Sequence, residues 1–151
     1  EILLLDEPFS HIDNFKKQSL RRSIFNYLKH NNITCIVATH DKDDVLGFAD
    51  TMIVLDKTEI ITKDSPQRIY ETPKTPLIAS FFGEFNVINN HIYYAHQLKI
   101  TEKSSLKGVV KQSYFNGNFW LIEVAYNSDS VFIAHHSELI KNSEICFKIN
   151  P

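Results

Sequence analysis

The first part of the chain alternates continuous apolar runs with a segment of helical periodicity. Residues 2–5 and 33–38 are apolar runs of the length and composition found in strands that are buried in parallel sheets. The segment between them has helical spacing and ends at Asn31-Asn32. The apolar side chains expected on its inward face are Leu20, Ile24, Tyr27 and Leu28. A strand, a helix and a second strand in this order predict a parallel α/β sheet.

Shorter elements are expected in the next part of the chain. Residues 41–49 predict a short helix, and residues 52–55 and 59–62 predict two strands joined by a polar turn. A further helix is expected to start at Ser65-Pro66, with Ser as the N-cap and Pro at the first helical position. That helix is expected to stop before Thr72-Pro73, because proline cannot continue it.

The pattern changes after Phe82-Gly83, where β-branched and aromatic residues replace helical periodicity. Residues 108–115 and 118–126 predict two strands on either side of Asn116-Gly117, a strong hairpin signal. Two further strand-like runs cover residues 131–134 and 145–149. Several short strands without helices predict a small barrel.

Length, net charge and cysteine spacing limit the classes of protein to which this chain can belong. The chain has 151 residues, enough for one domain or for a partial domain with a small module. Its net charge of −2 provides no basic field for nucleic acid or for an anionic membrane surface. Cys35 and Cys146 have no metal-type spacing, which favours two reduced thiols in a cytosolic protein. Because the chain opens on an apolar run directly after Glu1, without Met, we expect residue 1 to lie inside a domain.

Candidate chemistry begins where the first strand ends, at Asp6-Glu7. A strand buried on both faces tolerates charge at its carboxyl end, where open α/β sheets bind ligands. Two adjacent carboxylates repel one another, so a cation or a base's role explains them better than stability does. On this hypothesis Asp6 holds Mg²⁺ through water, and Glu7 orients and deprotonates the water that attacks a γ-phosphate. The alternative is an acidic turn after a strand.

A histidine follows the second strand in the same manner. His40 comes 33 residues after Glu7, in the segment Ala38-Thr39-His40-Asp41. Because parallel strands end at the same edge of a sheet, His40 is expected to face the same crevice as Asp6 and Glu7. There a neutral imidazole could bond the γ-phosphate and hold the attacking water. The alternative is a structural histidine.

These motifs together resemble those of a known family. Residues 5–13, Leu-Asp-Glu-Pro-Phe-Ser-His-Ile-Asp, resemble the Walker B segment and D-loop of ABC ATPases. Residues 39–41 resemble their switch-histidine loop. The resemblance implies that Asp6 is the magnesium-site aspartate, Glu7 the catalytic glutamate and His40 the γ-phosphate sensor.

The resemblance continues along most of the chain. Ser10 and Asp13 match the D-loop, which in the family contacts the partner subunit across bound ATP. Residues 49–55 and 65–70 resemble the tail of the nucleotide-binding domain. Residues 81–86 resemble the junction to the C-terminal β domain of importer ATPases of the iron, polyamine, sulfate and sugar group.

The resemblance implies a fold in two parts. Residues 1–85 are expected to form the C-terminal half of an ABC nucleotide-binding domain, a partial P-loop NTPase sheet of the α/β class. Residues 86–151 are expected to form a small all-β, OB-like regulatory module of the TOBE type. The implied function is an ATP-hydrolysing subunit that powers import, with ATP and Mg²⁺ as cofactors. Its implied partners are a second ATPase subunit in a homodimer and membrane permease subunits, with no nucleic acid, at the cytoplasmic face of the cell membrane.

Motifs that hold the nucleotide in this family are missing from these 151 residues. They contain no G-x-x-x-x-G-K-[ST] phosphate-binding loop, and the family's signature motif is missing too. We therefore expect this chain alone to neither bind nor hydrolyse ATP appreciably. An alternative is that the β module is the useful unit, a ligand-sensing module without activity of its own. A DNA-organising ATPase head is disfavoured by the β module and by the lack of a basic stripe.

Three other features have simpler explanations. The helix basic residues Lys16, Lys17, Arg21 and Arg22 predict a solvated face or a dimer contact. His135-His136 are expected to point to opposite faces of a strand, unless the strand has ended there, and so not to chelate a metal together. The aromatic residues of the second half are expected to form core and cross-strand pairs and not a nucleic-acid platform. Those residues are Tyr93, Tyr94, Phe115 and Trp120.

Overall fold

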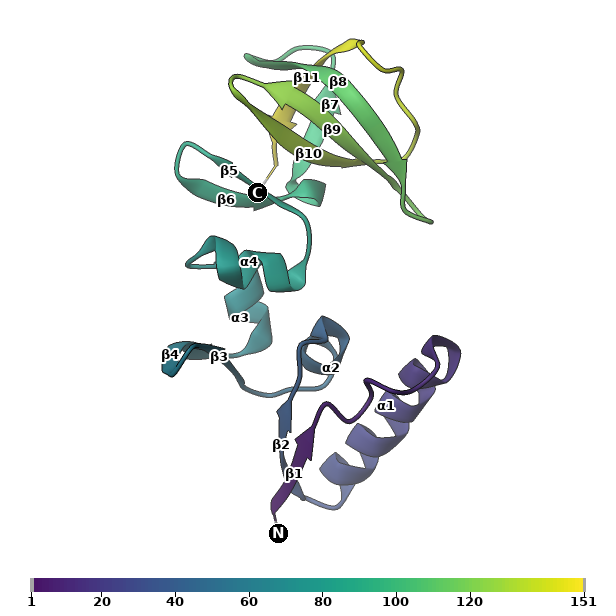
Figure 1. The fold of residues 1–151 in the computed structure, drawn as a ribbon, viewed down its shortest axis with the longest axis vertical. Coiled ribbons are helices and arrows are strands. Elements are labelled where there is room, and N and C mark those ends of the chain that lie inside the picture. The colour runs from purple at the N-terminus through teal and green to yellow at the C-terminus, as the bar shows by residue number, and fades with distance from the viewer. Residues whose placement is uncertain (1, 151) are drawn as a thin grey trace. The chain divides into compact units, whose positions relative to one another are not determined.

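The computed structural model describes residues 2–150, which divide into two compact units (Figure 1). The first unit ends at Thr72 and the second begins at Pro73. Among these residues, no helix combines the length and the apolar character needed to cross a bilayer. Each unit has a hydrophobic core of its own. The domain boundary at residues 85/86 stays a prediction.

The first unit is built on a strand–helix–strand motif. Strands β1 (Ile2–Asp6) and β2 (Thr34–Ala38) pair in parallel, as predicted, and the 17-residue helix α1 (Asn14–His30) connects them. In the register of this pair, Asp6 lies opposite Ala38, so both strands end at the same level. The core between the helix and the sheet is formed by buried Phe9, Phe25 and Leu28 with their partly buried neighbours.

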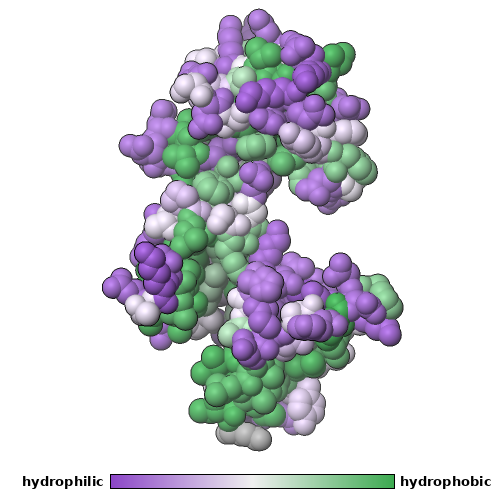
Figure 2. Space-filling view, in the orientation of Figure 1, coloured by the Kyte–Doolittle hydropathy of each residue, from purple (hydrophilic) through white to green (hydrophobic). Residues whose placement is uncertain are grey.

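Two details of this motif differ from the sequence prediction. The strands are not buried on both faces: Ile2, Leu4 and Ile36 are 59–70% exposed, because α1 covers only the other face of the pair. Figure 2 shows this apolar surface over the β1–β2 pair. Tyr27 is 63% exposed and not inward-facing, because Phe25 and Leu28 fill the buried side of α1.

The rest of the first unit consists of short elements. Helix α2 (Lys42–Leu46) follows β2, and strands β3 (Met52–Asp56) and β4 (Glu59–Asp64) form an antiparallel pair of their own. Helix α3 (Pro66–Glu71) starts and stops where the sequence predicts. The Ser65 hydroxyl accepts a hydrogen bond from the Arg68 amide at 3.4 Å, which confirms the predicted N-cap.

The second unit opens with elements that the sequence pattern did not single out. Helix α4 (Pro76–Phe82) has Pro at its first position, and its N-cap Thr75 accepts a hydrogen bond from the Ile78 amide at 3.3 Å. Strands β5 (Phe85–Ile88) and β6 (His91–Tyr94) then form a hairpin. A single 3-10 turn, η1 (Ala95–Gln97), leads into β7 (Leu98–Thr101).

A five-stranded antiparallel sheet forms the body of the second unit, in the order β10-β9-β8-β11-β7. Its other strands are β8 (Leu106–Phe115), β9 (Trp120–Tyr126), β10 (Asp129–His135) and β11 (Glu144–Ile149). The predicted hairpin is confirmed: Gly117 has a φ of 77°, which glycine adopts without strain, although β9 starts at Trp120 and not at residue 118. The two edge strands, β7 and β10, contact each other, so the sheet curls in the manner of a small OB-like barrel (Figure 1).

The interior of this sheet is apolar and closely packed. The fully or nearly fully buried residues are Ile88, Leu98, Val110, Ile122, Val124, Val131, Ile133 and Phe147. One polar side chain is also buried: Asn86 of β5 accepts from the Phe132 amide at 2.6 Å and donates to the Phe132 carbonyl at 2.8 Å. Asn86 thereby satisfies both backbone groups of an edge residue and joins the β5–β6 hairpin to β10. Gly108 is also required by packing, since a Cβ there would lie 2.5 Å from the Ala125 carbonyl oxygen.

Candidate functional site

Glu7 and His40 meet at the carboxyl ends of β1 and β2. Glu7 directly follows β1, His40 lies two residues after β2, and the Glu7 amide donates to the Ala38 carbonyl at 2.9 Å. His40 Nδ1 lies 2.6 Å from Glu7 Oε1, and the His40 backbone amide donates to the same oxygen at 3.2 Å. The expectation that these two side chains share one edge of the sheet is therefore met by a direct contact.

The backbone at Glu7 explains how its carboxylate reaches across to β2. Glu7 has a φ of 45°, in the left-handed region, which costs a non-glycine residue of order 1 kcal/mol or more. The turn after it is closed by Ser10, whose amide and hydroxyl both donate to the Glu7 carbonyl, at 3.2 and 2.9 Å. Phe9, 2% exposed, anchors the same turn in the core against Phe25. These contacts hold the strained residue, and its side chain points at the end of the neighbouring strand.

The other predicted site residues lie close to this turn in the sequence. Asp6 is the last residue of β1 and is exposed. Ser10 is exposed, and its hydroxyl lies 2.8 Å from His11 Nδ1. Asp13 is the residue before α1, where its carbonyl accepts from the Lys16 and Lys17 amides, while its side chain makes no capping bond. The roles expected for these three residues stay predictions.

The described residues contain no group of three or more His, Cys, Asp or Glu side chains that could hold a metal ion. Mg²⁺ keeps several waters and is commonly bound by one or two carboxylates together with substrate phosphates. A single exposed carboxylate at a strand end, such as that of Asp6, suits this mode of binding. One carboxylate is too few to bind a metal ion through protein ligands alone.

A buried ion-pair network lies behind the His40 loop, and the sequence did not reveal it. Arg21 of α1 is 1% exposed, so its prediction as part of a solvated basic face is wrong. Its Nε donates to Asp44 Oδ1 and its terminal nitrogen to Asp41 Oδ2, both at 2.5 Å. Asp44, itself buried, accepts from the Thr39 hydroxyl at 2.7 Å through its second oxygen. Three acidic residues within positions 41–44 are the sequence signal for such a partner, but they do not say which of the four basic residues turns inward.

The carboxylate of Asp41 is held in its charged form by this network. Burial raises the pKa of Asp41, but the Asp43 amide, the Arg21 guanidinium and the charge of Lys17 outweigh burial and lower the pKa below its ordinary value of 3.8. A carboxyl group whose pKa is depressed by folding stabilises the protein fully above its ordinary pKa, and this stabilisation is lost as the pH falls through the folded-state value.

We therefore expect the melting temperature of the first unit to fall on acidification below about pH 4, and to fall less in Asp41→Asn. Asparagine can still cap α2 but no longer carries the charge that binds Arg21. Asp50→Asn, at an 85% exposed position, is the matched control and should follow the wild-type curve. Thermal melts monitored by circular dichroism between pH 3 and 6 measure this, and parallel curves for wild type and Asp41→Asn would contradict it.

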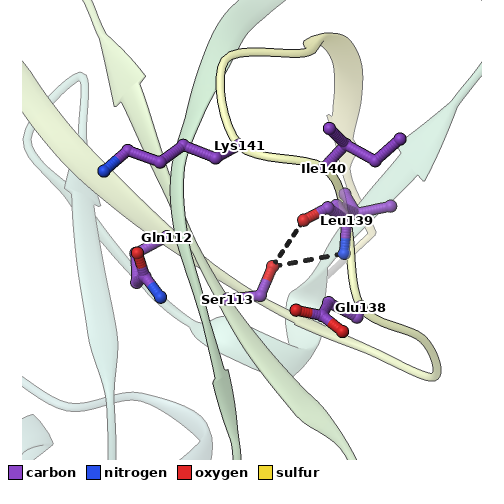
Figure 3. A pocket seen from close by; sticks show the side chains of 6 residues that line it. All are labelled: Gln112, Ser113, Glu138, Leu139, Ile140 and Lys141. Atoms are coloured by element: carbon purple, nitrogen blue, oxygen red, sulfur yellow. Dashed lines mark hydrogen bonds between the residues drawn. The ribbon is translucent and has the colours of Figure 1, made fainter.

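The second unit contains a histidine pair and a hollow beside β8. The rings of His135 and His136 lie 4.1 Å apart between centroids, because β10 ends at His135 and strict alternation no longer applies. Burial, together with the charges of His136 and Lys99, lowers the pKa of His135. A shallow hollow beside β8 is crossed by Ser113, whose hydroxyl donates to the Leu139 carbonyl at 3.1 Å and accepts from its amide at 3.2 Å (Figure 3). The Ser113 hydroxyl and the Leu139 backbone are thus already paired with each other.

The aromatic residues of this unit occupy the places expected for structural residues. Phe115 and Trp120 are directly opposite one another on β8 and β9, with ring centroids 5.1 Å apart. Tyr94 is 4% exposed, and Tyr93 packs against the core. The prediction of cross-strand pairs and core residues is therefore confirmed, although Phe115 itself is 67% exposed.

Comparison with known proteins identifies relatives among transport subunits. No family model matches the chain. It is 38% identical over 92 residues to the sulfate/thiosulfate import ATP-binding protein CysA of Mannheimia succiniciproducens, a match that covers 61% of this chain and 26% of the relative. It is 30% identical over 133 residues to the spermidine/putrescine import ATP-binding protein PotA of Bacillus thuringiensis, which covers 87% of this chain and 41% of the relative. The chain thus spans between about a quarter and two fifths of the length of these relatives.

Proposed function

We propose that this chain, whose homologues are ATP-binding subunits of ABC importers, is the part of such a subunit that activates the attacking water and senses the γ-phosphate of ATP. The observation that carries the proposal is the contact between Glu7 and His40 at the ends of two adjacent parallel strands. This edge is where open α/β sheets bind their ligands. An acid and an imidazole in contact there are suited to moving a proton and to binding phosphate oxygens.

The roles follow from the atoms that each side chain presents. Glu7 accepts the proton of the attacking water and orients that water toward the γ-phosphate. His40 Nδ1 faces Glu7 Oε1, a carboxylate oxygen that only accepts, so Nδ1 carries the hydrogen of this contact. The opposite ring nitrogen, Nε2, can donate to a phosphate oxygen when the ring is protonated on both nitrogens. Asp6, exposed beside this pair, would hold Mg²⁺ through water. When bound, the ion neutralises charge on the phosphates.

The remaining parts of the proposal concern the complete subunit. We place β1 and β2 in the sheet of a P-loop NTPase, and Ser10 and Asp13 in a D-loop that faces a second ATPase subunit. A homodimer of such subunits would drive permease subunits from the cytoplasmic face of the membrane. The exposed apolar face of β1 and β2 supports the larger sheet, because such faces are normally covered in parallel sheets.

A second candidate function is that of a ligand-sensing module, residing in the β unit alone. The specific observation in its favour is that this unit has its own buried core and a curled five-stranded sheet of the OB-like kind. The two functions are compatible within one subunit. They differ in what residues 1–151 can do by themselves.

Ligand-induced stabilisation tests the proposal. A ligand that binds only the folded state stabilises that state and so raises its melting temperature. When the free ligand concentration is a hundred times the Kd, the stabilisation is about 2.7 kcal/mol. ATP with Mg²⁺ should therefore stabilise the full-length subunit, and that subunit should release phosphate. Residues 1–151 alone should show no shift, because they contain no phosphate-binding loop. A full-length subunit without ATP hydrolysis would overturn the proposal, and tight ATP binding by residues 1–151 in calorimetry would overturn its second part.

A further inference from the structure

The His40 side chain makes few contacts of its own that would fix its position. The His40 side chain is 82% exposed, and within residues 2–150 the group that it bonds is the Glu7 carboxylate. The next helix, α2, is only five residues long, so it is not stable by its own hydrogen bonds. A loop of this kind needs a support elsewhere if the 2.6 Å contact with Glu7 is to persist.

Arg21 supplies that support on both sides of His40. One arm of its guanidinium binds Asp41, the residue after His40. The other binds Asp44, which in turn accepts from the hydroxyl of Thr39, the residue before His40. The Thr39 hydroxyl also accepts from the Asp41 amide at 3.0 Å, which closes the loop around the histidine. A planar guanidinium can bind two carboxylates at fixed angles, which an ammonium group cannot do.

The same side chain reaches the segment that carries Glu7. The guanidinium carbon of Arg21 lies 5.5 Å from the centroid of the Phe9 ring, within the range of a cation–π contact. Phe9 anchors the turn that begins at Glu7. Arg21 therefore contacts the supports of both members of the Glu7–His40 pair.

The charge balance makes this support depend on Arg21. Asp44 is 3% exposed and Asp41 31% exposed at their side chains, and both carboxylates face one guanidinium. Lys17 adds a longer contact to Asp41 at 3.7 Å, and Asp43 lies 3.6 Å from the Arg21 guanidinium. Without Arg21 a buried carboxylate would lack its counter-charge beside a second one, and this arrangement is strongly unfavourable. The loop would then move toward water, and His40 with it.

We propose that Arg21 is a positioning residue for His40, fixing the Thr39–Asp41 loop so that the imidazole meets Glu7. Its effect on turnover rests on the proposed function, but its effect on the loop does not. Arg21 touches no reacting atom. Removal should therefore lower kcat and leave KM for ATP little changed.

The test compares three substitutions in the full-length subunit. Arg21→Met should lower kcat between about tenfold and a hundredfold, as expected when a reacting group is misplaced by about an ångström. Arg21→Lys should lower kcat less than Arg21→Met does, because lysine keeps the positive charge but not the planar set of donors that binds two carboxylates. Arg22→Met is the matched control, an exposed arginine next to it on α1, and should behave as wild type. Wild-type kcat in Arg21→Met, or an equal loss in Arg22→Met, would overturn the inference.

A second measurement separates this inference from the proposed function. The His40 amide donates to Glu7 Oε1, so its hydrogen-exchange rate by NMR reports the contact without any nucleotide. Arg21→Met should accelerate this exchange in residues 1–151, and unchanged exchange would overturn the inference whether or not the subunit hydrolyses ATP. If Arg21→Met does not fold, Asp41→Asn takes its place, since it keeps the cap of α2 and weakens the Arg21 contact together with the longer Lys17 contact. Faster exchange in that variant supports the inference, and unchanged exchange overturns it.

Discussion

Replacing Glu7 with glutamine in the full-length subunit is expected to lower ATP turnover by about 10²–10⁴-fold and to leave ATP binding intact. Glutamine has the shape of glutamate and keeps a side-chain oxygen that can accept from His40, so the turn after β1 should be preserved. The amide cannot take a proton from water, so the step assigned to Glu7 is lost. Phosphate release measures turnover, and calorimetry with ATP measures binding.

Glu84→Gln is the matched control for this substitution. Glu84 is an exposed glutamate of the second unit, so the same loss of charge occurs away from the proposed site. Its turnover should equal that of wild type. Turnover of Glu7→Gln at the wild-type rate would remove Glu7 from its role, whereas a parallel loss of ATP binding would show that the substitution disturbs more than the proton transfer.

The meeting of Glu7 and His40 could be predicted because it follows from the order of the elements that carry them. Each residue follows an apolar run, and two parallel strands joined by a helix must end at the same edge. The register that places Asp6 opposite Ala38 then sets both side chains at one level. The sequence pattern was sufficient for this, since the strand–helix–strand order itself implies that the two strand ends meet.

The burial of Arg21 could not be predicted in the same way. Four basic residues on one helix are most often solvated, and only the fold shows that Asp41 and Asp44 turn back onto one of them. Tyr27 is the converse case, since its spacing suits an inward face while its neighbour Phe25 occupies that place. The partners that bury Arg21 belong to the segment after β2, at least 20 residues away along the chain.

The short elements of the second unit show a different limit. The hairpin at Asn116-Gly117 was predictable because a glycine with positive φ is a local requirement. Strands β5, β6 and β7 have four residues each, too few to show a period of two. Their strand conformation depends on pairing: β5 with β6, and β7 with β11. The pairing of β7 with β11 is long-range and leaves little trace in the sequence.

Among substitutions in the second unit, Phe147→Ala is expected to lower the free energy of unfolding most, by about 3–5 kcal/mol. Phe147 is fully buried in β11, between Ile100 of β7 and Leu106 of β8. Its ring also meets that of Tyr126 edge to face, with centroids 5.3 Å apart. Truncation would remove these contacts and leave a cavity that two strands, fixed by their ladders, cannot close.

Urea unfolding followed by Trp120 fluorescence measures this effect in the second unit alone, because Trp120 is the only tryptophan in the chain. Phe115→Ala is the matched control, since the same side chain is removed where it is 67% exposed, and a loss of about 1 kcal/mol or less is expected. Because Phe115 packs on Trp120, its removal should change the fluorescence of the folded state. The variants are therefore compared by the free energies of unfolding obtained from their urea transitions, and not by signal intensity. Equal losses in the two variants would mean that β11 is not the centre of the core, because only a residue enclosed on both sides can leave a cavity when it is cut back to alanine.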